Sequence, residues 1–123
     1  MKSLARRFLE DYGQTNSVQS LYEMSNISQR KTGVDAVIWY STRNGQHGPR
    51  IKLGLKSNLI SCGDCVSISI EDEPKVVAGN PNLFSKDTIQ DAITWVKKNK
   101  DLLMKVWNGE ITYDDFSDYS KKI

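Results

Sequence analysis

Two cysteines, Cys62 and Cys65, lie three positions apart in the sequence. Two thiolates at this spacing can ligate a zinc ion or form a redox-active pair. A structural zinc site needs about four ligands, and the sequence adds a single histidine, His47. A thioredoxin-like pair lies where a strand runs into a helix, whereas this pair leads into a predicted strand. We therefore expect structural turn cysteines without a metal or a disulfide framework; a metal shared between two chains is the alternative.

His47 is the one histidine that could act as a catalytic base. A histidine base needs a nucleophile and an orienting carboxylate within reach, and the spacing of residues indicates neither. We interpret His47 as a solvated loop residue. The acidic residues at 71–73 and 114–118 could ligate a metal, but such groups are more often solvated surface charge. The sequence therefore predicts no catalytic residue, no metal and no cofactor, in a protein that is not an enzyme.

Basic side chains gather in the middle of the chain. Residues 30–56 contain one acidic residue and six basic residues: Arg30, Lys31, Arg43, Arg50, Lys52 and Lys56. Single-stranded nucleic acid is bound by cations beside aromatic rings. We predict a binding site made of Arg43, His47, Arg50, Lys52, Lys56, Trp39 and Tyr40, with Arg30 and Lys31 entering the same hairpin. The alternative is ordinary surface, because a sheet with one solvated face needs polar residues there.

The element that must position these residues is a hairpin over residues 32–56. Val34, Ala36, Ile38 and Tyr40 alternate with Asp35, Val37 and Trp39, which predicts a central strand with apolar residues on both faces. In the second strand the core face is predicted to carry Ile51, Leu53 and Leu55, and the solvated face Arg50, Lys52 and Lys56. The connecting loop contains the turn formers Asn44, Gly45, Gly48 and Pro49.

Helices and shorter strands are predicted on both sides of the hairpin. Before it, a helix from Ser3 to Gly13 is expected to pack on the sheet. Residues 18–22 favour a short helix, and residues 24–30 could equally form an edge strand. After it, a third strand is predicted over residues 65–71 and a short fourth strand over residues 75–78, in an antiparallel meander.

The C-terminal third of the sequence has the pattern of three helices. Ser85 is placed to cap the first, whose apolar spacing is interrupted near Asn99, so a break and a second helix over residues 100–107 are predicted. Gly109 is expected to end that helix. Thr112 and Asp115 have the spacing of a capping box, and Phe116 and Tyr119 are expected to dock the last helix. Trp107 is predicted to be a core anchor.

The length and composition indicate one α+β domain over residues 1–123. The chain is near the common single-domain size, with 38% hydrophobic residues and no apolar run that could cross a bilayer. We expect a small antiparallel sheet of three or four strands packed against an N-terminal helix and C-terminal helices. We also expect a cytoplasmic protein without membrane contact, and the sequence does not indicate its oligomeric state.

Several motifs resemble a small, poorly characterised family of bacterial and phage proteins. The similarity lies in Thr32-Gly33, Val37-Ile38-Trp39 and Gly48-Pro49-Arg50-Ile51-Lys52, followed by Trp95-Val96, Asn99, Leu102-Leu103 and Trp107. It covers residues 26–123, and genes of distant relatives often lie beside toxin–antitoxin pairs. The resemblance implies a short sheet followed by a helix with spaced tryptophans. It further implies a phage-encoded binding protein that modulates a host or defence protein; the alternative is a nucleic-acid-binding accessory protein that uses residues 43–56.

Overall fold

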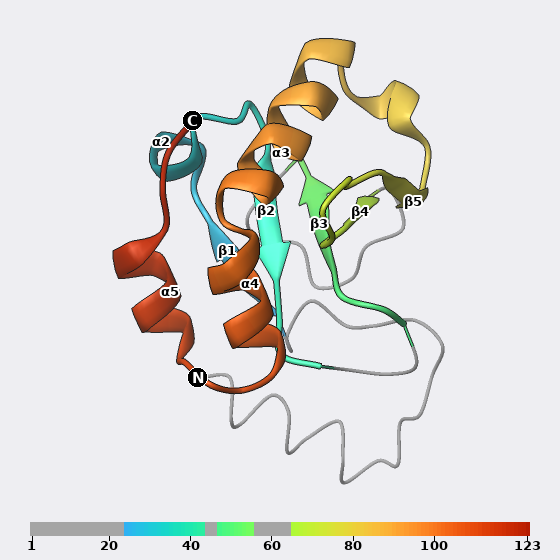
Figure 1. The fold of residues 1–123 in the computed structure, drawn as a ribbon. Helices are drawn as coiled ribbons and strands as arrows, with labels where there is room; N and C mark the ends of the chain where they lie inside the picture. Colours follow the sequence, from blue (N-terminus) through green and yellow to red (C-terminus); the bar gives the residue numbers. More distant parts are fainter. Residues whose placement is uncertain (1–23, 44–46, 56–64) are drawn as a thin grey trace, which may run out of the picture.

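A computed structural model describes residues 24–43, 47–55 and 65–123 as an antiparallel sheet with helices on one face (Figure 1). The strands follow one another in space in the order β1-β2-β3-β4-β5, as the predicted meander requires. In chain order the elements are β1 (Ser25–Ile27), α2 (Gln29–Thr32), β2 (Val37–Tyr40), β3 (Arg50–Gly54), β4 (Val66–Ser69), β5 (Val76–Ala78), the 3-10 helix η2 (Pro81–Leu83), α3 (Lys86–Lys98), α4 (Lys100–Trp107) and α5 (Tyr113–Tyr119).

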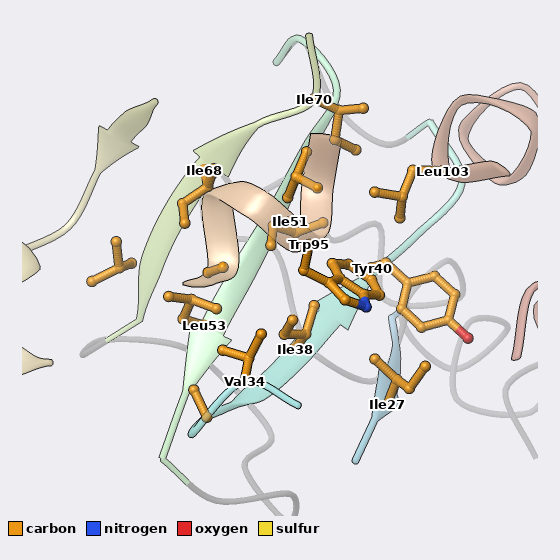
Figure 2. Close-up of a cluster of buried hydrophobic side chains, with 14 of the residues drawn as sticks. Ile27, Val34, Ile38, Tyr40, Ile51, Leu53, Ile68, Ile70, Trp95 and Leu103 are labelled. Atoms are coloured by element: carbon orange, nitrogen blue, oxygen red, sulfur yellow. The ribbon is translucent and has the colours of Figure 1, made fainter. Parts of the chain in front are cut away.

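The core lies between the sheet and helices α3, α4 and α5 (Figure 2). Register places one buried side chain from each of four strands in a row across the inner face: Ile27, Ile38, Leu53 and Val66. The helices cover this row with buried side chains that include Trp95, Leu103 and Phe116. Because side chains alternate along a strand, the neighbouring residues of the same strands lie on the outer face.

The α+β class is confirmed, while several details of the sheet differ from the prediction. The described residues form five strands instead of three or four, because β1 pairs with β2 as the edge strand that was one of two interpretations of residues 24–30. Leu55 is 65% exposed, so its assignment to the core is wrong. β3 ends at Gly54, which pairs with the first residue of β2, and Leu55 lies past that pairing. The predicted helices over residues 3–13 and 18–22 lie outside the described residues.

The predicted C-terminal helices are confirmed at their ends. Ser85 Oγ accepts the Thr88 N–H at 3.1 Å and caps α3, and α3 and α4 meet at Asn99. The capping box of α5 is formed by Thr112 and Asp115. The expectation that Tyr119 docks α5 is wrong, because this ring is 69% exposed. No helix in the described part of the chain is both long and apolar enough to cross a membrane.

The last residues of the chain return to the start of the sheet as an extended segment. The Ile123 N–H donates to the Thr32 carbonyl oxygen at 3.0 Å. Lys98 Nζ donates to the Lys122 carbonyl oxygen at 2.8 Å. A Cβ at Gly33 would lie 3.1 Å from Ile123 Cγ1, so the segment packs tightly against the end of α2. Residues 120–123 thereby connect the α3–α4 junction to α2 (Figure 1).

Candidate binding site

Three of the predicted site residues, His47, Arg50 and Lys52, lie together at one end of the β2–β3 hairpin. Ile51 and Leu53 are buried in the core, so Arg50 and Lys52 project from the other face of β3. Pairing with β2 on one side and β4 on the other fixes this orientation, since a slip of one residue would exchange the two faces. We call His47, Arg50 and Lys52 the cationic cluster.

Electrostatic interactions link the members of the cationic cluster. Desolvation lowers the pKa of the Lys52 amine, and the charge of Arg50 lowers that pKa further. Desolvation lowers the pKa of the exposed His47, and the charges of Arg50 and Lys52 add to this effect. These charge effects all act between like charges, which destabilise one another. The arrangement therefore favours a ligand that brings negative charge.

Two lysines elsewhere in the described residues, Lys97 and Lys100, have carboxylate partners, which the cationic cluster lacks in that part of the chain. Lys100 Nζ lies 3.0 Å from Asp72 Oδ1, and the hydrogen bond and charge of Asp72 raise the pKa of Lys100. Lys97 Nζ lies 3.6 Å from Glu73 Oε2, so the acidic turn at 71–73 faces the α3–α4 junction. Within the described ranges, no member of the cationic cluster forms an ion pair. Its positive charge is not compensated there.

The cross-strand neighbours of the cluster on β4 are hydroxyl groups. Arg50 is paired with Ser69 and Lys52 with Ser67. The Ser69 hydroxyl already donates to Glu71 Oε2 at 2.5 Å, and Ser67 is buried. The sequence alone does not indicate that these serines are neighbours of the cations, because only the register between β3 and β4 places them opposite each other. Neutral neighbours leave the cations available to a partner.

Three other predicted cations, Arg43, Arg30 and Lys31, do not join the cluster. Arg43 follows β2, where its backbone N–H donates to the Trp107 carbonyl oxygen at 2.8 Å, and its charge shifts neither cluster pKa. Arg30 and Lys31 belong to α2, beside the start of β2 (Figure 1), where Lys31 Nζ donates to a hydroxyl of α5 at 2.9 Å. They therefore enter the hairpin from its N-terminal end, as the sequence indicated, and not at the loop that carries His47. Lys56 lies outside the described residues.

Trp39 and Tyr40 are adjacent residues that face opposite sides of β2. The Tyr40 ring is buried in the core, where its hydroxyl donates to the Tyr113 carbonyl oxygen at 3.3 Å. Burial raises the pKa of Tyr40 to about 12. Trp39 is paired with Lys52 on the outer face, but it is 4% exposed and packs against Met24. The prediction that these rings are part of the binding surface is wrong, because neither is accessible to a ligand.

The expectation of no disulfide at the cysteines is also wrong. Cys65 is buried and disulfide-bonded, and the one other cysteine of the sequence, Cys62, lies outside the described residues. A domain of this length does not need a cross-link to build its core. That need does not decide whether two thiols meet the geometry of a bond. Over residues 24–43, 47–55 and 65–123, no group of three or more His, Cys, Asp or Glu side chains could hold a metal ion.

No protein-family model matches the chain, no curated protein matches it in sequence, and no solved structure matches it.

Proposed function

We propose that the protein is a non-enzymatic binding protein that contacts an acidic surface of a partner protein through the cationic cluster. The observation that carries this proposal is the environment of Lys52, which is partly buried beside Arg50 and has no ion-pair partner among the described residues. A carboxylate from a partner would supply the missing counter-charge. Complementary charge also accelerates association. The resemblance to phage and bacterial proteins makes a host or defence protein the partner class to test first.

An acidic protein fits the cluster better than a nucleic acid does. Proteins that bind single-stranded nucleic acid combine a positively charged groove with aromatic side chains on which the bases stack. Here Trp39 and Tyr40 are buried, so only the charged part of such a platform is present. Binding through phosphates alone requires many cations, since each neutralised phosphate contributes a small increment, and the cluster has three basic side chains. We therefore treat nucleic acid as an outcome that the experiment must distinguish.

The test compares two charge-reversal variants as baits in a bacterial lysate treated with nuclease. The cluster variant carries Arg50→Glu and Lys52→Glu. The control variant carries Lys86→Glu and Lys105→Glu, at exposed positions on α3 and α4. Each substitution changes the charge by two, so both variants have a formal net charge of −2 instead of +2. We expect wild type and the control to retain the same protein, and the cluster variant to lose it.

Three further results complete the test. Melting curves must show that both variants are folded, and Arg50→Gln with Lys52→Gln repeats the test without added negative charge. Affinity for the purified partner should fall as salt is raised, because screening weakens exposed charge interactions. Equal affinity of wild type and the cluster variant would contradict the proposal. Material that wild type retains from an untreated lysate but not from the nuclease-treated lysate would assign the cluster to nucleic acid.

A further inference from the structure

A groove lies at the opposite end of the β2–β3 hairpin from the cationic cluster. It is bounded by the start of β2, the end of β3, η2 and the first turn of α3 (Figure 1). Pairing of Val37 with Gly54 holds its two strand walls together. The cavity volume is about 320 Å³, at the lower end of the range for ligand clefts. A space of this size suits one or two side chains better than a large cofactor.

Two large aliphatic side chains in the wall of the groove are accessible to solvent. Leu55 is 65% exposed and Leu83 is 39% exposed. Leu83 is held by η2, in which Asn80 Oδ1 accepts the Asn82 N–H at 3.0 Å. The next residue, Phe84, packs its ring partly against the core. Leu83 is thus presented on a fixed turn, and a contacting side chain would remove its apolar surface from water.

The groove also offers one charge that has no partner among the described residues. Asp35 is the only charged side chain among the described residues that line it. In that part of the chain its carboxylate accepts no hydrogen bond and forms no ion pair. Ser85 and Thr88 lie nearby, but the Ser85 hydroxyl donates to Thr88 Oγ1 at 2.9 Å and accepts the Thr88 N–H. The exposed Gln29 adds a neutral amide to the lining, so the charged group open to a ligand is an anion beside exposed leucines.

We propose that this groove is a second docking surface, which binds a segment of a partner protein carrying an apolar side chain with a lysine or arginine next to it. The apolar side chain packs against Leu55 and Leu83, and the cation pairs with Asp35. This charge preference is opposite to that of the cationic cluster. The two ends of one hairpin thus select ligand groups of opposite sign, and the second surface goes beyond the function proposed above.

The experiment is a titration of the isotope-labelled full chain with two short peptides, followed by NMR. The test peptide is an acetylated and amidated arginine–leucine–arginine tripeptide, and the comparison peptide has glutamate in place of arginine. We expect the first to shift the amide signals of Asp35, Leu83 and Thr88, and the second to leave them unchanged. An arginine–glycine–arginine peptide, which keeps the charge and removes the apolar side chain, should shift them much less.

Matched variants separate the groove from general surface effects. Leu83→Ser should weaken the Kd of the test peptide about tenfold through lost apolar contact, whereas Val77→Ser, at an exposed residue outside the groove, should not. Asp35→Asn should weaken it about threefold, and Asp118→Asn on α5 should not. The proposal is overturned if the test peptide does not shift the groove signals, or if the glutamate peptide shifts them equally. It is also overturned if the test peptide shifts the amide signals of α5 and not those of the groove.

Discussion

The side chain of Asn99 holds the backbone of Lys121 through two hydrogen bonds. Asn99 Oδ1 accepts the Lys121 N–H at 2.7 Å, and Asn99 Nδ2 donates to the Lys121 carbonyl oxygen at 2.9 Å. The same Nδ2 donates to the Trp95 carbonyl oxygen at 3.0 Å. Asn99 is 1% exposed, so both donors of the amide and its acceptor are used in a buried position. This one side chain attaches the C-terminal segment to the α3–α4 junction.

Replacing Asn99 with alanine should destabilise the protein by about 1–3 kcal/mol, because backbone groups of Lys121 lose their partners. Urea denaturation followed by circular dichroism measures the free energy of unfolding. Asn108→Ala is the matched control, since Asn108 is exposed at the end of α4 and should change stability by less than about 0.5 kcal/mol. Equal stability of the two variants would show that the attachment of Lys121 contributes nothing.

Trp107→Ala should cost about 3–5 kcal/mol, as truncation of a buried aromatic side chain does. The Trp107 side chain is 5% exposed at the end of α4, which agrees with its predicted role as a core anchor. Tyr119→Ala removes a ring that is 69% exposed and serves as the control, with little expected change. Thermal melting of both variants tests this. A Trp107→Ala protein with wild-type stability would place the ring outside the core.

Stability should fall as the pH rises from about 10 to 12 because of Tyr40. Its pKa is about 12 in the folded protein and about 10 in the unfolded chain. The unfolded state therefore loses the proton first, so the stabilisation is complete below pH 10 and is lost as the pH passes the folded pKa. This difference of about two between the folded and unfolded pKa corresponds to a loss of about 2–3 kcal/mol in the free energy of unfolding.

The measurement is the free energy of unfolding at pH 9 and pH 11.5, for wild type and for Tyr40→Phe. Other groups titrate in this range in both proteins, so the difference between the two pH dependences isolates Tyr40. A tyrosinate absorbance titration should also show one ring that ionises near 12. Parallel pH dependences in the two proteins would mean that the Tyr40 hydroxyl is not protected by burial.

The pKa of His47 should rise in Arg50→Gln and in Lys52→Gln. The charges of Arg50 and Lys52 both lower this pKa in wild type, and desolvation lowers it more than either charge does. In each variant the pKa should therefore rise only part of the way back to the ordinary value of about 6.5. An NMR titration of the imidazole signals measures it directly. Lys86→Gln is the control and should leave the titration unchanged. If the cluster variants titrate as wild type does, His47 is too far from β3 to belong to the cationic cluster.

The sequence predicted those parts of the fold that depend on neighbouring residues. The break at Asn99 and the capping box of Thr112 and Asp115 are set within one or two helical turns, and both are present. The end of β3 depends on where β2 begins, which is a pairing between distant residues. Leu55 was assigned to the core because the apolar alternation of residues 51–55 continues past the last residue of β3 that pairs with β2.

The candidate site was predicted less well, since its composition requires three-dimensional proximity. Arg50 and Lys52 share a face by strand alternation, and the structure keeps them together. The same alternation already indicated that Trp39 and Tyr40 could not both face one ligand. What it could not indicate is that both rings are buried, because the contact of Trp39 with Met24 depends on the pairing of β1 with β2.

The strand order β1-β2-β3-β4-β5 determines which contacts can form early during folding. Each strand pairs with its neighbour in the sequence, so these contacts close comparatively short loops at low entropic cost. The hydrogen bond from Ile123 to Thr32 joins far more distant residues and is expected after the sheet has formed. Loss of the Asn99 contacts should then accelerate unfolding and leave the folding rate almost unchanged. The C-terminal segment would thus govern the lifetime of the folded state and have little effect on how fast that state forms.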